Sequence, residues 1–215
     1  MPADVKICGL STPETVEAAI AAGADLIGLV FYPKSPRNVS LEQAAALAAQ
    51  ARGRAKIVSL VVDAEDATLR EIAARVAPDL FQAHGSESPE RVGEIARLTG
   101  KPVIKAVRVK EAVDIVAAAA YSTVASLIMY DAKAPETLGN ALPGGNGHAF
   151  DWGLLDNRKR PPFMLAGGLT PANVAEAIRV TGAPIVDVSS GVESAPGVKD
   201  ASLIRKFIEA AKRPR

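Results

Sequence analysis

Short apolar runs alternate with alanine-rich helical stretches along the whole chain, and this alternation constrains the fold more than any other feature. The runs predict strands at residues 5–8, 25–31, 55–61, 79–82, 102–107, 124–130, 163–165 and 185–188. The stretches between and after them predict helices at residues 13–22, 41–51, 65–76, 88–98, 110–119, 171–180 and 200–211. Such alternation is typical of parallel strands with helical crossovers. About eight units in 215 residues favour a closed (β/α)8 TIM barrel over an open sheet.

The composition fits one barrel domain covering residues 1–215 and argues against several other classes of protein. Hydrophobic residues make up 48% of the chain and charged residues 23%, which are ordinary globular values. The formal net charge is +1 and no basic run with interleaved aromatic residues occurs, so we expect no nucleic-acid partner. No signal-peptide pattern and no apolar run of about 18 residues is present, so we expect no membrane span. A single cysteine cannot form an internal disulfide, which favours a cytoplasmic location, and no obligate protein partner is evident.

One glycine-rich segment between Asp131 and Trp152 interrupts the alternation. Loops of this length are uncommon in compact domains and are usually functional when ordered. The segment follows a predicted strand, so in a barrel it would lie on the catalytic face. We expect it to form a mobile cover for a ligand.

In barrels of this kind the working residues lie at the carboxyl ends of the strands and in the loops that follow them. These positions contain the side chains and glycines that could carry chemistry: Cys8, Arg37, Gln82, His84, Asp131, Lys133, Gly167, Gly168, Asp187, Ser189, Ser190 and Gly191.

Cys8 and Asp131 are candidates for an acid–base pair. Each ends a predicted strand, so both would face the same mouth of the barrel, where a thiol and a carboxyl group could exchange protons with a substrate. Lys6 shares a strand face with Cys8, because side chains two residues apart point the same way. A lysine in an apolar strand needs a buried partner, and its charge would favour the Cys8 thiolate.

Two glycine motifs predict a phosphate site. Gly167-Gly168 and Ser190-Gly191 follow the last two predicted strands, where the barrel fold often binds phosphate. Glycines allow the backbone N–H groups to approach an anion closely.

Arg37 follows the second predicted strand, in a loop that Pro33 and Pro36 stiffen. A guanidinium in this position could bind a planar carboxylate through two hydrogen bonds. His84 and His148 have no partners at metal-ligand spacing, so we predict no metal site.

Taken together, these motifs resemble the phosphoribosylanthranilate isomerase family along nearly the whole chain. The matching pieces are Lys6-Ile7-Cys8-Gly9, Gly28-Leu29-Val30-Phe31, Ser35-Pro36-Arg37, Gln82-Ala83-His84-Gly85, Asp131, Gly144-Gly145-Asn146-Gly147, Phe150-Asp151-Trp152, Leu165-Ala166-Gly167-Gly168-Leu169 and Asp187-Val188-Ser189-Ser190-Gly191-Val192-Glu193. The chain departs from the family pattern in packing positions, such as Ala83 where leucine is usual, and no chemical position is lost.

The resemblance implies a cofactor-free Amadori rearrangement in L-tryptophan biosynthesis. N-(5-phosphoribosyl)anthranilate would become 1-(2-carboxyphenylamino)-1-deoxyribulose 5-phosphate, with Cys8 as general base and Asp131 as general acid. The resemblance also implies which residues bind the substrate. Arg37 would bind the anthranilate carboxylate, Asp187 the sugar hydroxyls, and His84 would be a further substrate contact. The phosphate would be bound by Gly167, Gly168, Ser190 and Gly191.

Three alternatives stay open on the sequence. Another sugar-phosphate barrel is the nearest, although a histidine-pathway isomerase uses two aspartates and the first strand here ends in Cys8. A pentose-phosphate epimerase needs metal ligands that the chain does not offer at recognisable spacing. A non-catalytic phosphometabolite-binding barrel would need neither Cys8 nor Asp131, and a redox-sensing thiol protein usually has a second, resolving cysteine.

Overall fold

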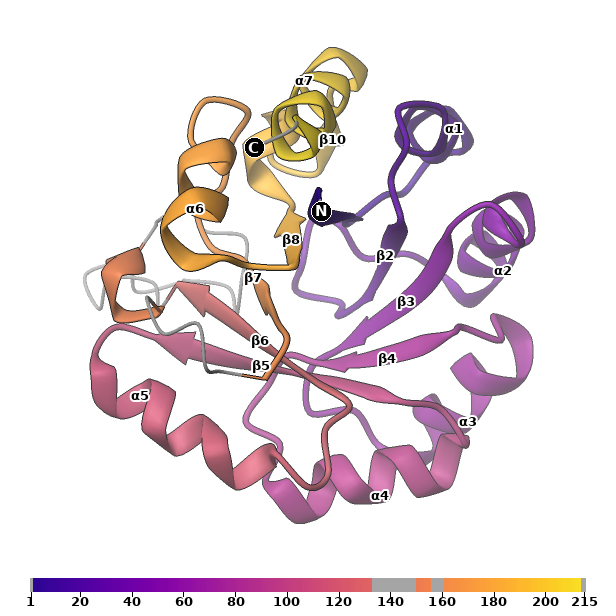
Figure 1. Ribbon diagram of the computed structural model, residues 1–215. Helices are drawn as coiled ribbons and strands as arrows, with labels where there is room; N and C mark the ends of the chain where they lie inside the picture. Colours follow the sequence, from indigo (N-terminus) through magenta and orange to yellow (C-terminus); the bar gives the residue numbers. More distant parts are fainter. Residues whose placement is uncertain (1, 133–149, 156–160, 214–215) are drawn as a thin grey trace.

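Eight parallel strands close into a barrel in a computed structural model of the chain that describes residues 2–132, 150–155 and 161–213 (Figure 1). The strands follow one another around the barrel in chain order, and the last pairs with the first. They are β1 (Asp4–Cys8), β2 (Leu26–Phe31), β3 (Lys56–Val61), β4 (Leu80–Ala83), β5 (Val103–Val109), β6 (Leu127–Ala132), β7 (Phe163–Leu165) and β8 (Ile185–Val188). The predicted (β/α)8 fold class is confirmed.

Helices surround the barrel and connect successive strands (Figure 1). The α-helices are α1 (Pro13–Ala21), α2 (Leu41–Ala51), α3 (Asp66–Arg75), α4 (Pro89–Thr99), α5 (Ala112–Ala117), α6 (Val174–Thr181) and α7 (Ala201–Lys212). Short 3-10 helices complete the ring: η1 (Ala118–Tyr121), η2 (Trp152–Leu155) and η3 (Ser190–Val192). The chain also forms a small antiparallel hairpin after β8, from β9 (Glu193–Ala195) and β10 (Val198–Lys199), which the sequence analysis did not predict.

Helices α1, α2, α4 and α7 begin where the sequence provides capping side chains. Ser40 accepts a hydrogen bond from the backbone N–H of Gln43 at 3.1 Å, and the Gln43 side chain accepts one from the N–H of Ser40 at 3.4 Å, so the two residues form a capping box at the start of α2. Helix α6 begins at Val174, three residues later than predicted, because the Asn173 side chain accepts a hydrogen bond from the N–H of Thr170 and holds the intervening residues in a turn.

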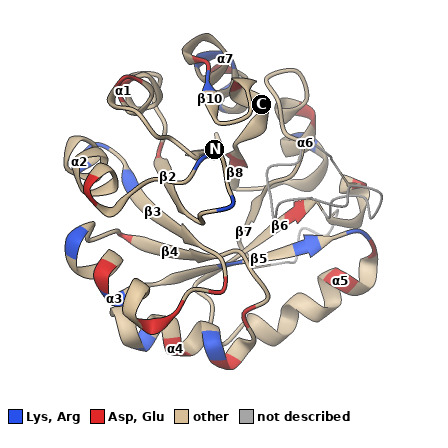
Figure 2. Ribbon diagram, turned by 180° about the vertical axis from the view of Figure 1, so that it is seen from behind, with Lys and Arg blue, Asp and Glu red and all other residues tan. Residues whose placement is uncertain are grey.

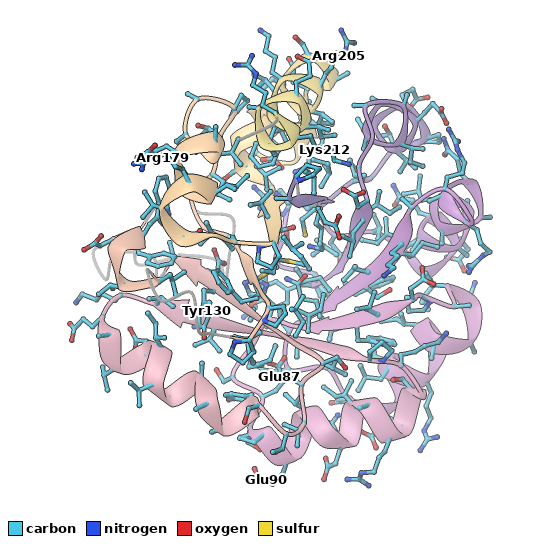
Figure 3. The ribbon with its side chains drawn as sticks, viewed as in Figure 1. Glu87, Glu90, Tyr130, Arg179, Arg205 and Lys212 are labelled. Atoms are coloured by element: carbon cyan, nitrogen blue, oxygen red, sulfur yellow. The ribbon has the colours of Figure 1, made fainter. Side chains whose placement is uncertain are left out.

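The strand side chains alternate between the barrel interior and the layer under the helices. One end of the interior is filled by an apolar cluster of Leu26, Val58, Ile104, Ala106, Met129, Met164 and Ala166. Outward residues pack under the helices, as Tyr130 does with its ring 5.5 Å from that of Phe163 (Figure 3). Figure 2 shows most charged residues on the helices and loops and only a few on the barrel strands.

Two predictions concern residues that lie outside the described ones. The ligand cover expected of the segment between Asp131 and Trp152 lies mostly within residues 133–149, which the structure does not describe. The candidate residue Lys133 lies in the same range. Among the helices that the structure describes, none is long and apolar enough to cross a membrane.

Candidate active site

A pocket opens at the carboxyl ends of the strands and gathers most of the predicted site residues. It is lined by Cys8, Val30, Tyr32, Ser35, Arg37, Leu60, Val62, His84, Asp131, Ala166, Gly167, Asp187 and Ser189. Of the predicted set that the structure describes, Gln82, Gly168, Ser190 and Gly191 do not line this pocket: Gln82 lies on β4, Gly168 in the loop after β7, and Ser190 and Gly191 in η3. The thiol and the carboxyl group therefore face one cavity from two different strands, β1 and β6.

Lys6 lies inside the barrel and has a buried ionic partner, Asp187, as predicted for a lysine in an apolar strand. Its Nζ donates a hydrogen bond to Oδ1 of Asp187 at 2.7 Å, and the Lys6 side chain is completely buried. Lys6 and Asp187 pair in register across the contact between β1 and β8, so this ion pair lies where the barrel closes.

The ionisation of Cys8 is set by opposing effects. Burial raises the pKa of the thiol, the Lys6 charge lowers it, Asp187 raises it and Lys199 lowers it, with a net rise. The prediction that Lys6 favours the thiolate therefore has the right sign, but burial outweighs it. Burial lowers the pKa of Lys6, but the nearby Asp187 carboxylate overcomes this effect and leaves that pKa raised, so Lys6 is a cation.

Asp131 is held by a short chain of buried polar side chains. His84 Nε2 lies 3.1 Å from Oδ2 of Asp131, and His84 Nδ1 lies 2.8 Å from the side-chain nitrogen of Gln82. Gln82 Nε2 also lies 3.5 Å from the sulfur of Met129, while its Oε1 is buried without a partner among the described residues. If the Gln82 amide donates to Nδ1, Nδ1 is an acceptor and the histidine proton lies on Nε2, toward Asp131.

Arg37 is buried and its guanidinium is bound by Glu193 through two hydrogen bonds, from Nε at 2.7 Å and from Nη2 at 2.8 Å. Lys199 donates to the same carboxylate at 2.6 Å and to the carbonyl oxygen of Ser189 at 2.9 Å. Burial favours the neutral form of Glu193, but the two cations outweigh it and lower the pKa of this carboxyl group. The β9–β10 hairpin therefore fixes the position of the Arg37 guanidinium through Glu193.

The sequence analysis did not predict this role for Glu193 and Lys199. The signal that could have found the hairpin is Pro196-Gly197 between two short runs, a dipeptide typical of turns. Gly197 has a φ of +82°, and its N–H donates to Oε2 of Glu193 at 3.2 Å.

The two glycine motifs lie side by side, as a shared anion site requires. Gly167 and Gly168 have φ values of +84° and +63°, which favour glycine. A Cβ on Gly191 would collide with the carbonyl oxygen of Leu169, and one on Gly167 with the backbone N of Ala132. The end of β6 and the loops after β7 and β8 therefore approach one another closely, and phosphate binding between the two loops stays a prediction.

In the part of the chain that the structure describes, no group of three or more His, Cys, Asp or Glu side chains is placed to bind a metal ion.

Together, the closed parallel barrel and a pocket with a few polar side chains at the carboxyl ends of its strands define the class of (β/α)8-barrel enzymes. Comparison with known proteins identifies the family. The model of the N-(5'-phosphoribosyl)anthranilate (PRA) isomerase family matches residues 5–210, so the chain belongs to this family and is an isomerase.

Relatives match over nearly their full length. N-(5'-phosphoribosyl)anthranilate isomerase of Rhodopseudomonas palustris (strain BisA53) is 57% identical over 213 residues, covering 99% of this chain and 97% of the relative. The crystal structure of phosphoribosyl anthranilate isomerase from Thermotoga maritima has a TM-score of 0.87 at 37% identity, with 98% of both chains covered. A phosphoribosyl anthranilate isomerase in complex with reduced 1-(o-carboxyphenylamino)-1-deoxyribulose 5-phosphate has a TM-score of 0.83 at 36% identity, again with 98% of both chains covered.

Proposed function

We propose that this chain converts N-(5-phosphoribosyl)anthranilate to 1-(2-carboxyphenylamino)-1-deoxyribulose 5-phosphate, with Cys8 as general base and Asp131 as general acid. The observation that carries the proposal is that these two groups, from β1 and β6, line one pocket in a member of the isomerase family. The proposal includes a place in L-tryptophan biosynthesis and a cytoplasmic location.

Ring opening and removal of the C2 proton each take one proton transfer to or from the enzyme, and no step needs an external oxidant or reductant. Asp131 gives its proton to the ring oxygen of the ribose, the bond between that oxygen and C1 breaks, and the nitrogen lone pair forms a Schiff base. Cys8, as thiolate, takes the proton from C2, and the released electron pair forms the double bond of an enolamine. The enolamine then tautomerises to the ketone, so atoms and electrons balance within the substrate.

Asp131 must carry a proton at the start and be a carboxylate after the first step. His84 supports the second state, because an Nε2–H that points at Oδ2 of Asp131 stabilises the carboxylate that proton transfer creates. Gln82 fixes this tautomer from the other side of the ring. His84 also lines the pocket, so the predicted substrate contact fits the same side chain.

The remaining residues bind the substrate in this proposal. Arg37 binds the anthranilate carboxylate, and its contacts with Glu193 limit how the guanidinium can turn. Asp187 reaches the sugar hydroxyls, because it lines the pocket while one of its oxygens pairs with Lys6. Gly167, Gly168, Ser190 and Gly191 provide backbone N–H groups for the phosphate.

Two variants test the proposal, Cys8→Ala and Asp131→Asn. Each should lower kcat by on the order of 10²–10⁴, measured as loss of fluorescence of freshly made phosphoribosylanthranilate. Both should still bind the reduced product analogue in a titration, because neither group supplies the main binding contacts.

Near-wild-type turnover by either folded variant would refute its catalytic role. A histidine-pathway aminoaldose offered to the wild-type chain in the same experiment tests the nearest alternative, because turnover of that substrate alone would favour it over the proposed reaction.

A further inference from the structure

Gly28 occupies an inward position on β2 where any other residue would place a side chain inside the barrel. A Cβ built there would lie 2.8 Å from Sγ of Cys8, 3.0 Å from the Cα of Cys8 and 3.1 Å from Nζ of Lys6. The first distance is shorter than carbon–sulfur contacts allow, so the thiol fills the space that the missing side chain leaves. The lysine ammonium reaches the edge of the same space.

The backbone gives no separate reason for a glycine here. Gly28 does not have a positive φ, so its strand conformation is open to other residues. Glycine also weakens the interior of a strand, where it often marks a close approach of another group. Position 28 therefore requires glycine because a larger residue would occupy the space that the Cys8 thiol fills.

The same residue also fixes the backbone that carries the thiol. Gly28 is the register partner of Cys8 between β1 and β2, and its carbonyl oxygen accepts hydrogen bonds from the N–H groups of Gly9 at 2.8 Å and Leu10 at 3.1 Å. These bonds hold the turn immediately after Cys8. A shift of β1 away from a new side chain at position 28 would strain them.

The geometry points to Gly28 as a positioning residue for the general base: the space over its Cα holds the Cys8 thiol beside the Lys6 ammonium. This inference rests on the proposed function, because it treats Cys8 as the base. The Lys6 charge lowers the pKa of the thiol, whereas burial and Asp187 raise it, so the contact between Lys6 and Cys8 has a chemical consequence. The other titratable or charged groups that face the thiol are Lys199 and, across the pocket, Arg37, His84 and Asp131.

The test is Gly28→Ala, with Gly93→Ala as the matched control. Gly93 lies in α4, and a Cβ there would meet the Val124 side chain at 3.6 Å, an ordinary contact. Gly28→Ala should lower kcat by about 100-fold, the cost of displacing a catalytic group by about 1 Å, with KM changed by less than about threefold. The control should leave both constants unchanged.

Iodoacetamide alkylation as a function of pH reports the thiol directly, because Cys8 is the only cysteine in the chain. In Gly28→Ala the midpoint of this profile should move to higher pH, because the added methyl group separates the thiol from the Lys6 ammonium. A purely structural role for Gly28 would not move the midpoint. An unchanged kcat or an unchanged midpoint would overturn the inference.

A third variant covers the case in which Gly28→Ala does not fold. Removal of the sulfur in Cys8→Ala/Gly28→Ala takes away the shortest contact of the new methyl group and leaves those with the Cα of Cys8 at 3.0 Å and Nζ of Lys6 at 3.1 Å. The second Ala substitution should therefore lower Tm less in Cys8→Ala than in the wild type. Equal loss of Tm in the presence and absence of the sulfur would overturn the inference. Wild-type turnover by Cys8→Ala would instead refute the proposed function, and the alkylation midpoint of Gly28→Ala would still decide whether Gly28 positions the thiol.

Discussion

The buried contact between Glu193 and Arg37 predicts a large and pH-dependent loss of stability in Glu193→Gln. This substitution keeps the size of the side chain but leaves Arg37 and Lys199 without the carboxylate that both contact. The side chains of Glu193, Arg37 and Lys199 are exposed by only 4%, 7% and 1%. Removal of one partner from a buried ion pair costs about 3–5 kcal/mol, and the hydrogen bond that glutamine can still accept places this change near the lower end.

The expected loss converts to a measurable change in Tm. For a domain of this size, 1 kcal/mol corresponds to about 2–4 °C, so Glu193→Gln should lower Tm by about 6–12 °C at pH 7. Glu176→Gln is the matched control, because Glu176 pairs with Arg179 on the surface at 2.5 Å with side chains exposed by 55% and 71% (Figure 3). Such a surface pair contributes at most about 1 kcal/mol, so the control should lose less than about 4 °C.

The pH dependence of the Tm difference separates lost charge from lost packing. The pKa of Glu193 is lowered in the folded chain, so the stabilisation by its carboxylate is complete above the unfolded value of about 4.3. It disappears as the pH falls through the folded value. The Tm difference between the wild type and Glu193→Gln, followed by circular dichroism, should therefore be full at pH 7 and narrow below about pH 4. A Tm loss no larger than that of Glu176→Gln, or a gap that stays constant with pH, would refute the reasoning.

Two further predictions concern the groups around the acid and the base. Lys6→Met should move the midpoint of Cys8 alkylation to higher pH because the Lys6 charge lowers the pKa of the thiol, and Lys6→Met/Asp187→Asn provides a variant in which no buried carboxylate is left unpaired. An unchanged profile in both variants would remove Lys6 from the mechanism. Gln82→Met keeps the side-chain length but loses the amide donor to His84, so kcat should fall by about tenfold and the ¹⁵N shifts of His84 should show a changed tautomer balance. Unchanged shifts would show that Gln82 does not set the tautomer.

Much of the fold could be predicted because its signals are local. Apolar runs and helix caps are read within a dozen residues, and the predicted boundaries of the eight barrel strands lie within three residues of the observed ones. The positions of Cys8 and Asp131 followed from a single rule, that barrel strands carry working residues at their carboxyl ends.

The rest of the site depends on contacts between residues that are far apart in the chain. Glu193 meets Arg37 across a sequence separation of 156 residues, and no local pattern indicates that pair. Gly28 illustrates the same limit, because the sequence shows a glycine in a strand but not which side chain fills the space beside it. Such contacts follow from the register and closure of the barrel, which one sequence does not specify directly.

The ion pair between Lys6 and Asp187 also has a consequence for how the chain acquires its activity. Its partners are 181 residues apart, on the first and last strands, so they cannot meet until β8 has been synthesised and has docked beside β1. During synthesis the strand that carries Cys8 emerges first and stays open to water, where its thiol has the pKa of an ordinary cysteine. The closing step buries that thiol and brings Lys6 and Asp187 together, so formation of the barrel and maturation of the site are one event. Resistance of Cys8 to alkylation at neutral pH therefore reports barrel closure during refolding.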